Sequence, residues 1–409
     1  PGVGSASQIP GGIERVITVG AVSKGQIIAS DLVDVTGPQP VPSHLQAIPF
    51  ARASFGQPIQ QVVGPYPYVD VRDVSPDNSS LACAPLKEGS LAGKIALIAR
   101  GGCDFADKVY NAQQAGAVLA LIYNDTDEIT EIACGGQHCG EGEITILAAI
   151  ITKTSGERLL AWQKLYPNAT LQLVPETRVV IVPERVVQDF SGRGPAFMRY
   201  LKPDVVAPGV DILSAWYEPG QGTATYAQLS GSSMACAHVA GAAALLLQAH
   251  PGWDQDDVKA ALMGTASQEV YVDDAQSTRA GILARGAGLI DLSQANSSAL
   301  LLSPASLALP SALPGHSYTF SLTVRSNSSS GSTQVYSTAV EGGQGLSIGV
   351  PASVSIAAGS AVPVEVTVNV PANTQAGDLE AEILFRQGSV DIHLPVWVHI
   401  HPLNTAADI

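Results

Sequence analysis

Hydrophobic residues along the chain follow the two periods that distinguish strands from helices. Residues 16–22 form a short, almost continuous apolar run, which is typical of a buried strand. Residues 93–99 and 117–123 are two further runs of this kind, and the segment between them, which ends at residue 116, has helical spacing. We therefore predict a strand at 16–22, and a strand, a helix and a strand over 93–123.

The pattern changes after residue 303, where apolar and polar positions alternate. Residues 318–324 and 364–370 alternate at period two, and turns rich in Pro, Gly and Ser lie between them. We predict half-buried antiparallel strands here. Because about 100 residues of short strands suit two packed sheets, we expect a β-sandwich.

An amphipathic helix is predicted just before this region, at residues 253–263. Its inward face carries three apolar residues: Val258, Leu262 and Met263. Acidic side chains favour a helix N-terminus, because they oppose the positive end of its dipole. Three aspartates are placed to open this helix: Asp254, Asp256 and Asp257.

The most apolar segment of the chain follows a short polar stretch. It reads Ser-Gly-Ser-Ser-Met-Ala-Cys-Ala-His-Val-Ala-Gly over 230–241 and stops at His250 and Pro251, since proline lacks the N–H that a helix needs. Its small and apolar residues predict a helix buried almost all round. Ser233 lies at the N-terminus of this helix, where unpaired N–H groups and the helix dipole stabilise an oxyanion. We therefore predict that Ser233 is the nucleophile of an acyl-transfer reaction.

A serine nucleophile needs a base that takes its proton and a third group that orients the base. His238 is near in sequence, but five residues along a helix turn a side chain by about 140° and raise it by about 7.5 Å, so it cannot reach Ser233. We expect both His238 and Cys236 to be packed inside the protein. The other histidines lie in other regions: His44, His138, His250, His316, His393, His399 and His401.

Three motifs resemble signatures of the subtilisin-like serine proteases, in the order in which that family has them. Residues 231–241 resemble Gly-Thr-Ser-Met-Ala-Xaa-Pro-His-Val-Ala-Gly, with Ser232 for Thr and Ala237 for Pro. Residues 190–195 resemble Phe-Ser-Ser-Arg-Gly-Pro, and residues 202–209 resemble Lys-Pro-Asp-Ile-Xaa-Ala-Pro-Gly. Three ordered matches are far more specific than one, so the chain is identified as a member of this family.

The resemblance implies that Ser233 attacks a peptide carbonyl and forms an acyl-enzyme, which water then hydrolyses. None of the histidines has the family's His-Gly-Thr-His context, and no Asp-Ser-Gly or Asp-Thr-Gly occurs. Pro1 matches the last residue of the family's Ala-Gly-Asn-Xaa-Gly-Pro segment. We therefore expect the aspartate, the histidine and the oxyanion asparagine upstream of Pro1, in the N-terminal part of the same catalytic domain, and expect this chain alone to be inactive.

About 150 residues of different character interrupt the catalytic motifs, too many for a loop inside a compact domain. Their Gly-Lys-Ile strand at 93–95 and their Arg-Gly-Gly-Cys-Asp-Phe sequence at 100–105 resemble the protease-associated (PA) domain inserted in many subtilases. The resemblance implies an influence on substrate access or on protein contacts. A passive spacer is the alternative.

The fold expected from these patterns is α/β. We assign residues 1–29 and 179–299 to a parallel-sheet subtilase catalytic domain, residues 30–178 to an inserted α+β PA domain, and residues 300–409 to a β-sandwich that resembles the fibronectin type III-like domain of such proteases. Three histidines share one strand parity in this last domain, which leaves a metal site open beside ordinary packing: His393, His399 and His401.

Composition and charge disfavour several classes of function. The chain has 409 residues, 46% hydrophobic and 14% charged, and suits about three domains. A net charge of −15 disfavours nucleic acid and anionic membrane surfaces. The longest apolar run, 239–247, is shorter than the roughly 20 residues that span a bilayer, so we expect no membrane span. No cofactor or metal is expected; calcium is possible only by family resemblance.

Cysteines and sequons favour an extracellular or cell-surface location. Four cysteines form an even set, for which we predict the pairs Cys83–Cys103 and Cys134–Cys139. A metal site of Cys134, His138 and Cys139 is the alternative. Five Asn-Xaa-Ser/Thr sequons support the same location: Asn78, Asn124, Asn168, Asn296 and Asn327.

The sequence therefore predicts a secreted subtilisin-like serine endopeptidase that acts on protein or peptide substrates through Ser233. A second hypothesis is a non-catalytic, subtilase-derived binding or adhesion protein that uses its PA domain and its β-sandwich. The presence of Ser233 favours the first.

Overall fold

The structure, a computed structural model, describes residues 11–401 except 128, 130, 141, 198, 218–223, 329, 330 and 389. Pro1, with the family segment expected before it, lies outside the described residues. The chain divides into two compact units, one of Pro1–Ile27 with Ile181–Ile409 and one of Ile28–Val180. Each unit is described by itself below.

A three-stranded sheet, in the order β10-β1-β11, lies at the centre of the first unit. Its strands are β1 (Val19–Ala29), β10 (Arg178–Val187) and β11 (Val205–Pro208). Strands β1 and β11 are parallel, with Val19 opposite Val205. The strand predicted at 16–22 begins only at Val19, because the Thr18 N–H donates to the Asp204 side chain at 2.7 Å instead of joining the ladder.

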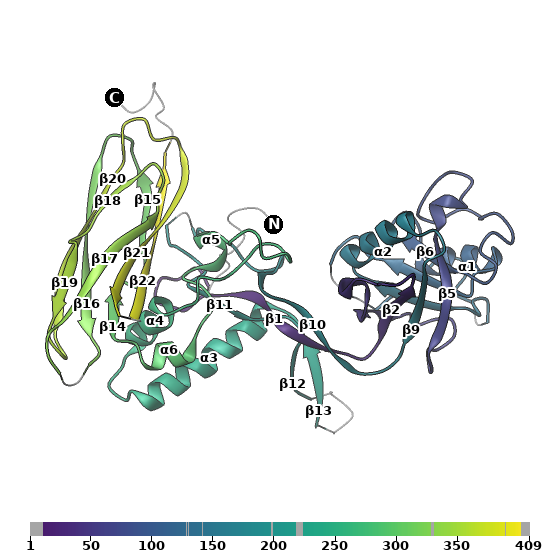
Figure 1. Cartoon of the computed structure of the whole chain (residues 1–409), viewed down its shortest axis with the longest axis horizontal. Helices are drawn as coiled ribbons and strands as arrows, with labels where there is room; N and C mark the ends of the chain where they lie inside the picture. Colours follow the sequence, from purple (N-terminus) through teal and green to yellow (C-terminus); the bar gives the residue numbers. More distant parts are fainter. Residues whose placement is uncertain are drawn as a thin grey trace. The chain divides into compact units, whose positions relative to one another are not determined.

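Helices cover this sheet. They are α3 (Ser232–Ala249), α4 (Gln255–Gly264), α5 (Ile282–Arg285) and α6 (Leu292–Asn296). Figure 1 shows α3 running along β11, with α4 and α6 close to it. The helix predicted at 253–263 is confirmed and starts at Gln255, since Asp254 is its N-cap and forms a capping box with Asp257. Its three predicted inward residues are buried.

The prediction that α3 is buried almost all round is wrong. Its buried residues form one stripe at helical spacing: Ala235, Val239, Ala242 and Leu246. The remaining faces are largely exposed, including Leu245 (53%) and Leu247 (44%). The composition of α3 is apolar on every side, but within the described residues only one side has a partner.

By length and composition, α3 is also the one helix in the described part of the chain that is apolar enough to cross a membrane, with a mean hydropathy of 1.3. A core helix of a globular protein passes the same test. The expectation of no membrane span therefore stays a prediction.

The C-terminal region is all β, as predicted from its alternating pattern. One sheet has the order β14-β16-β20-β18 and the other the order β15-β22-β21-β17-β19. Their strands are β14 (Leu300–Ser303), β15 (Leu307–Ala312), β16 (Ser317–Ser326), β17 (Gln334–Gly342), β18 (Ser347–Gly349), β19 (Ser353–Ile356), β20 (Ala361–Asn369), β21 (Gly377–Gln387) and β22 (Val390–Ile400). Inward residues of both sheets form one hydrophobic core.

The histidines of this sandwich have roles within the fold. His393 is buried and donates through Nε2 to the Ala287 carbonyl at 3.1 Å, and His399 contacts Asp378 at 2.8 Å. Among the described residues, no group of three or more His, Cys, Asp or Glu side chains is placed to hold a metal ion. The structure thus gives His393 and His399 partners other than a metal.

The second unit, Ile28–Val180, is built on an eight-stranded sheet in the order β3-β2-β9-β5-β6-β7-β8-β4. Its strands are β2 (Leu32–Gly37), β3 (Ile48–Pro49), β4 (Ala51–Arg52), β5 (Val63–Asp70), β6 (Ile95–Ala99), β7 (Leu119–Tyr123), β8 (Leu147–Ile151) and β9 (Thr170–Val174), and its α-helices are α1 (Phe105–Gln114) and α2 (Lys153–Leu165). The predicted strand, helix and strand correspond to β6, α1 and β7.

Both faces of the parallel strands β6, β7 and β8 are buried, which explains their continuous apolar runs. Leu97 and Leu121 pack in one cluster with Leu159 of α2. Ile98 and Ile122 pack in a second cluster with residues of α1. Each helix therefore covers one face of the sheet (Figure 1).

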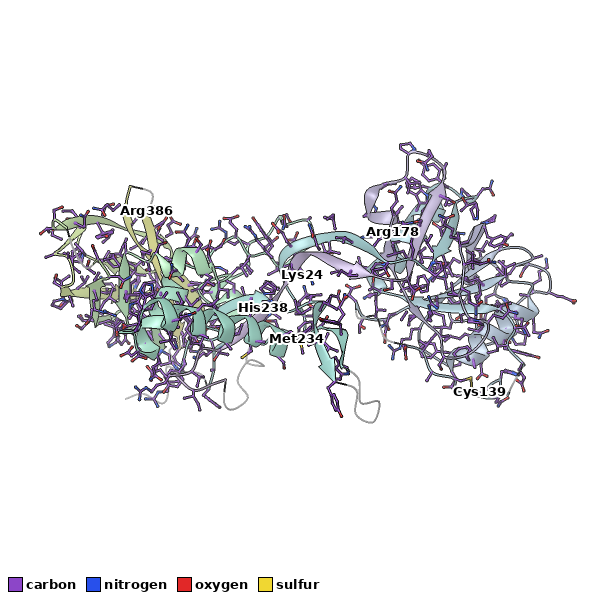
Figure 2. All side chains as sticks on the ribbon, turned by 90° about the horizontal axis from the view of Figure 1, so that it is seen from below. Lys24, Cys139, Arg178, Met234, His238 and Arg386 are labelled. Atoms are coloured by element: carbon purple, nitrogen blue, oxygen red, sulfur yellow. A yellow bond between two sulfur atoms is a disulfide. The ribbon has the colours of Figure 1, made fainter. Side chains whose placement is uncertain are left out.

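Two disulfides lie in this unit, and both predicted pairs are confirmed: Cys83–Cys103 and Cys134–Cys139. Figure 2 labels Cys139, which belongs to the second of these disulfides. The alternative metal site at Cys134, His138 and Cys139 is wrong for this structure, because both thiols are consumed in the disulfide. His138 instead stacks on Tyr110 and contacts Glu143 at 3.2 Å.

Candidate active site

Ser233 is the second residue of α3, and its side chain is exposed. Gly231 is the N-cap of α3, and its carbonyl accepts from the Met234 N–H at 3.1 Å. The first N–H groups of a helix have no intrahelical partner, so they are free to face an anion beside Ser233. In the described residues the Ser233 hydroxyl itself has no hydrogen-bond partner. The hydroxyl is therefore accessible, and within the described residues no base lies in hydrogen-bond contact with it.

A chain of backbone hydrogen bonds fixes Ser233 to the sheet. The Gly209 N–H donates to the Val22 carbonyl at 3.0 Å, and the Gly231 N–H donates to the Gly209 carbonyl at 2.8 Å. A Cβ on Gly209 would lie 2.7 Å from the Ala21 Cβ and 2.8 Å from the Gly231 oxygen. Glycine at this position is thus what allows the nucleophile turn to approach β1 and β11.

A hairpin of β12 (Ile212–Tyr217) and β13 (Ala224–Leu229) connects β11 to α3. Hydrogen bonds between side chains and the backbone hold the ends of this hairpin together. The Asp211 N–H donates to Ser230 Oγ at 2.9 Å, and Lys24 Nζ donates to the Asp211 carbonyl at 2.7 Å. These contacts join Ser230, the residue just before Gly231, to Asp211, and join Asp211 to Lys24 of β1.

His238 and Cys236 are not packed inside the protein, contrary to expectation. Both are exposed on α3, and Cys236 is a free thiol. His238 donates through Nδ1 to the Met234 carbonyl one turn earlier, at 3.0 Å. Figure 2 labels both residues on α3. The bond is a local one along the helix. That His238 does not serve as the base of Ser233 stays a prediction from the helical spacing.

A buried charge cluster supports the sheet beneath this site. Asp204 lies between two lysines, 2.6 Å from Lys202 Nζ and 2.8 Å from Lys259 Nζ. Its carboxylate also accepts from the Thr18 N–H, and Lys202 Nζ donates to the Val16 carbonyl at 3.0 Å. Burial lowers the pKa of Lys202 to about 8, an effect that Asp204 opposes and Lys259 reinforces. The cluster ties residues 16–18 to β11.

The motif at 190–195 has a comparable supporting role. Ser191 is buried, and its Oγ accepts from the Ala21 N–H of β1 at 2.9 Å. A Cβ on Gly194 would lie 2.1 Å from the Lys202 carbonyl oxygen, so this glycine allows the loop to cross the second motif closely. All three sequence motifs therefore meet around β1 and β11.

Sequence reasoning identified Ser233, Lys202 and Asp204 as parts of motifs, but it missed Lys259 and Lys24. Lys259 lies in α4, 55 residues after Asp204, and no local pattern marks it as the partner of a buried carboxylate. Lys24 lies within β1 and is equally unmarked. Only the tertiary packing brings these lysines to the site.

The chain matches the model of the subtilase family over residues 3–285 and therefore belongs to that family. The subtilisin-like protease SBT1.6 of Arabidopsis thaliana is 34% identical over 223 residues, which are 50% of this chain and 28% of that protein. The minor extracellular protease Vpr of Bacillus subtilis (strain 168) is 30% identical over 313 residues, 73% of this chain and 36% of that protein. The chain thus spans about a third of the length of these relatives.

Among solved structures, the psychrophilic subtilisin-like protease Apa1 of Pseudoalteromonas sp. AS-11 is 16% identical over 68% of this chain and 51% of that chain, with a TM-score of 0.31. Family membership rests on the sequence relatives and the family model.

Proposed function

We propose that this chain carries the nucleophile of a secreted subtilisin-like serine endopeptidase, with Ser233 as the catalytic serine. One observation supports this most: an exposed serine stands at the N-terminus of α3, in a motif of the family to which the chain belongs. Family membership brings with it protein or peptide substrates.

In this mechanism Ser233 Oγ loses its proton to a histidine and attacks the scissile carbonyl. The carbonyl oxygen becomes an oxyanion, which the Ser233 N–H and the positive end of α3 stabilise. The amine leaves as the acyl-enzyme forms, and water then attacks the acyl carbon and regenerates the free hydroxyl. The hydrogen bond from the Gly231 N–H to the Gly209 carbonyl fixes the start of α3, and with it the positions of the Ser233 hydroxyl and the Ser233 N–H.

The aspartate, the histidine and the oxyanion asparagine are proposed to come from a further part of the same catalytic domain. The uncovered side of α3 supports this proposal. Leu245 and Leu247 are 53% and 44% exposed on a helix whose composition is that of a core helix. A segment that covers these residues would bury their apolar surface and also approach Ser233 from the exposed side.

The other two regions are proposed to be the accessory domains of such proteases. For the unit Ile28–Val180, a PA domain is supported by the β6, α1 and β7 order and by the Arg-Gly-Gly-Cys-Asp-Phe sequence before α1. For the C-terminal sandwich, a fibronectin type III-like domain is supported by its two packed sheets, in which every strand pair except the parallel β15–β22 is antiparallel. An extracellular setting is supported by the two disulfides.

The test compares this chain with the complete product of its gene on an unfolded protein substrate. The proposal predicts no turnover by the chain alone, because loss of the base removes most of the rate enhancement, and turnover by the complete product that Ser233→Ala abolishes. If the complete product is also inactive, the binding-protein hypothesis replaces this one.

A further inference from the structure

Lys108 is a cation enclosed in the second unit. Its side chain is fully buried, between α1 and the segment that carries Cys83. Its Nζ donates to the Leu81 carbonyl at 2.6 Å and lies 3.7 Å from Cys83 Sγ. Within the described residues it forms no ion pair. An ammonium group in this position has a carbonyl and a sulfur as partners, and neither carries a full negative charge.

This arrangement is unfavourable for the charged lysine as long as the sulfur is neutral. Burial lowers the pKa of Lys108 to about 8, so the ammonium still predominates at pH 7 but is destabilised. A thiolate at Cys83 would supply the missing negative charge within 4 Å. The Lys108 ammonium is therefore placed to neutralise the negative charge that Cys83 would carry as a thiolate after reduction of the disulfide.

We propose that Cys83–Cys103 is a thiol–disulfide exchange site, in which Lys108 stabilises Cys83 as the departing thiolate. The proposal is independent of the protease function. It assigns the two sulfurs different roles, with Cys103 as the sulfur that is attacked and Cys83 as the leaving group. The co-reactant is a dithiol, either a small molecule or a protein with two neighbouring cysteines.

Charged groups on the neighbouring elements favour the same assignment. Asp104 directly follows Cys103 as the N-cap of α1. Its negative charge disfavours a thiolate on Cys103 and offsets the positive end of α1, which favours one. Two other charged groups of this region have partners of their own. The Asp107 carboxylate, in the first turn of α1, accepts from the Gln137 N–H at 3.1 Å, and the Arg100 guanidinium lies 3.6 Å from the Asp125 carboxylate.

Carbonyl groups act in the opposite direction at Cys83. The Leu81 and Gly101 oxygens lie 3.8 and 3.9 Å from its sulfur, and their partial negative charges disfavour a thiolate there. Lys108 is already bonded to the Leu81 oxygen, which reduces that repulsion. The nearest full charge at Cys83 is therefore positive.

The exchange balances in two steps. A thiolate of the dithiol attacks Cys103 Sγ, a new disulfide forms between the reductant and Cys103, and Cys83 leaves with the bonding electron pair as a thiolate beside Lys108. The second thiolate of the reductant then attacks the reductant's own sulfur in that mixed disulfide. Cys103 leaves and takes up a proton, and the dithiol has supplied two electrons. Cys83 is exposed and Cys103 is half-buried, so a reductant has access to the pair.

Reduction of Cys83–Cys103 would remove a covalent link between two segments of this unit. The disulfide joins the segment before β6 to the turn before α1, and Asn111 of α1 holds the same segment through the Ala82 carbonyl at 2.9 Å. The disulfide Cys134–Cys139 closes a loop with a sequence separation of only 5 and has no lysine contact in the described part of the chain. The proposal therefore concerns one of the two disulfides.

The test equilibrates the intact chain with reduced and oxidised dithiothreitol at pH 8. Acid quenching, alkylation and peptide mass spectrometry then report each cysteine. We expect Lys108→Gln to need about threefold more reducing buffer for half-reduction of Cys83–Cys103, because at pH 8 a leaving thiol whose pKa lies one unit below the ordinary value is much more fully ionised. The control, Lys94→Gln, removes a lysine of the same unit that contacts the Ser90 carbonyl at 3.5 Å, and should leave the midpoint unchanged.

A second measurement needs no variant and decides the matter if Lys108→Gln does not fold. In the fully reduced wild-type chain, the rate of Cys83 alkylation should rise with a midpoint at least one pH unit below the ordinary thiol value of about 8.5. Cys103 should titrate near or above that value. A Cys83 midpoint at 8.5 or higher, or equal redox midpoints for wild type and Lys108→Gln, would overturn the proposal.

Discussion

At the scale of single residues, the position of Ser233 depends on backbone groups and on buried charges beneath it. Ser233 is placed by the backbone of Gly209 and Gly231, and the strand beneath it is tied down by Asp204 and its two lysines. Asp204 is only 1% exposed, so its charge is compensated almost entirely by Lys202 and Lys259. Removing that charge would leave two cations in the interior.

We predict that Asp204→Asn lowers the free energy of local unfolding around β1 and β11 by about 3 kcal/mol or more, as is typical when one partner of a buried ion pair is removed. Hydrogen exchange of peptides from these strands measures this. Asp391→Asn is the matched control, because Asp391 pairs with Arg386 with both side chains about half exposed, and it should change stability by less than about 1 kcal/mol. Equal effects of the two variants would contradict the structural role of the cluster.

Residue identities could be predicted from the sequence only where a motif contains them. The motif placed Ser233 at the start of α3 correctly, and the even set of four cysteines led to both disulfide pairs. Lys259 and Lys24 were not, because a lysine that meets a distant carboxylate or carbonyl leaves no local pattern. The exposure of His238 and Cys236 was also missed, since the composition of α3 says nothing about which of its sides has a partner.

At the scale of elements, α3 has the composition of a core helix but packs along a single stripe. Its neighbours Leu246 and Leu247 illustrate the difference: Leu246 is fully buried and Leu247 is 44% exposed. Hydrophobic period and composition predicted the helix and its N-terminus correctly. They did not predict its burial, because burial depends on which other elements are present.

We predict that Leu246→Ala lowers the free energy of unfolding of this chain by about 3 kcal/mol, since it leaves a cavity between α3 and α6. Leu247→Ala should lower it by less than about 1 kcal/mol, because the side chain is already partly in water. Chemical denaturation of the two variants compares adjacent leucines on one helix. If Leu247→Ala is as harmful as Leu246→Ala, then α3 is covered on both sides in this chain and the account of its free face is wrong.

At the scale of the whole molecule, the sandwich and the catalytic segment of the first unit share a polar, buried contact. Arg285 pairs with Glu382 at 3.0 Å, with both side chains nearly buried, and Glu380 accepts from the Ile282 N–H at 2.6 Å. His393 reaches across from β22 to the Ala287 carbonyl. Alternating patterns predicted the sandwich itself. They did not predict this contact, because single polar residues such as Glu382 and His393 do not change the hydrophobic period of their strands.

His393 should make the stability of this unit depend on pH. Burial lowers the pKa of His393 below the ordinary 6.5; Glu382 opposes this shift and Arg285 reinforces it. Between the lowered folded value and 6.5, the unfolded chain binds more protons than the folded one, so stability falls as the pH falls below about 6.5. The slope contributed by this one group is at most about 1.4 kcal/mol per pH unit.

Thermal denaturation between pH 7.5 and 5 measures this dependence. His393→Gln keeps an N–H donor for Ala287 but does not titrate, so its stability should fall less steeply with acid than that of the wild type. His316→Gln replaces an exposed histidine in the same sandwich and should follow the wild type. If His393→Gln shows the wild-type slope, another group controls the acid response.

The central claim is that Ser233 is a catalytic nucleophile, and covalent labelling tests it most directly. A fluorophosphonate probe reacts with serines that a neighbouring base activates, and peptide mass spectrometry identifies the labelled residue. In the complete product of the gene, we predict labelling at Ser233, its loss in Ser233→Ala, and its retention in Ser232→Ala, the adjacent control. Labelling that is absent from the complete product, or that persists in Ser233→Ala, would contradict the assignment.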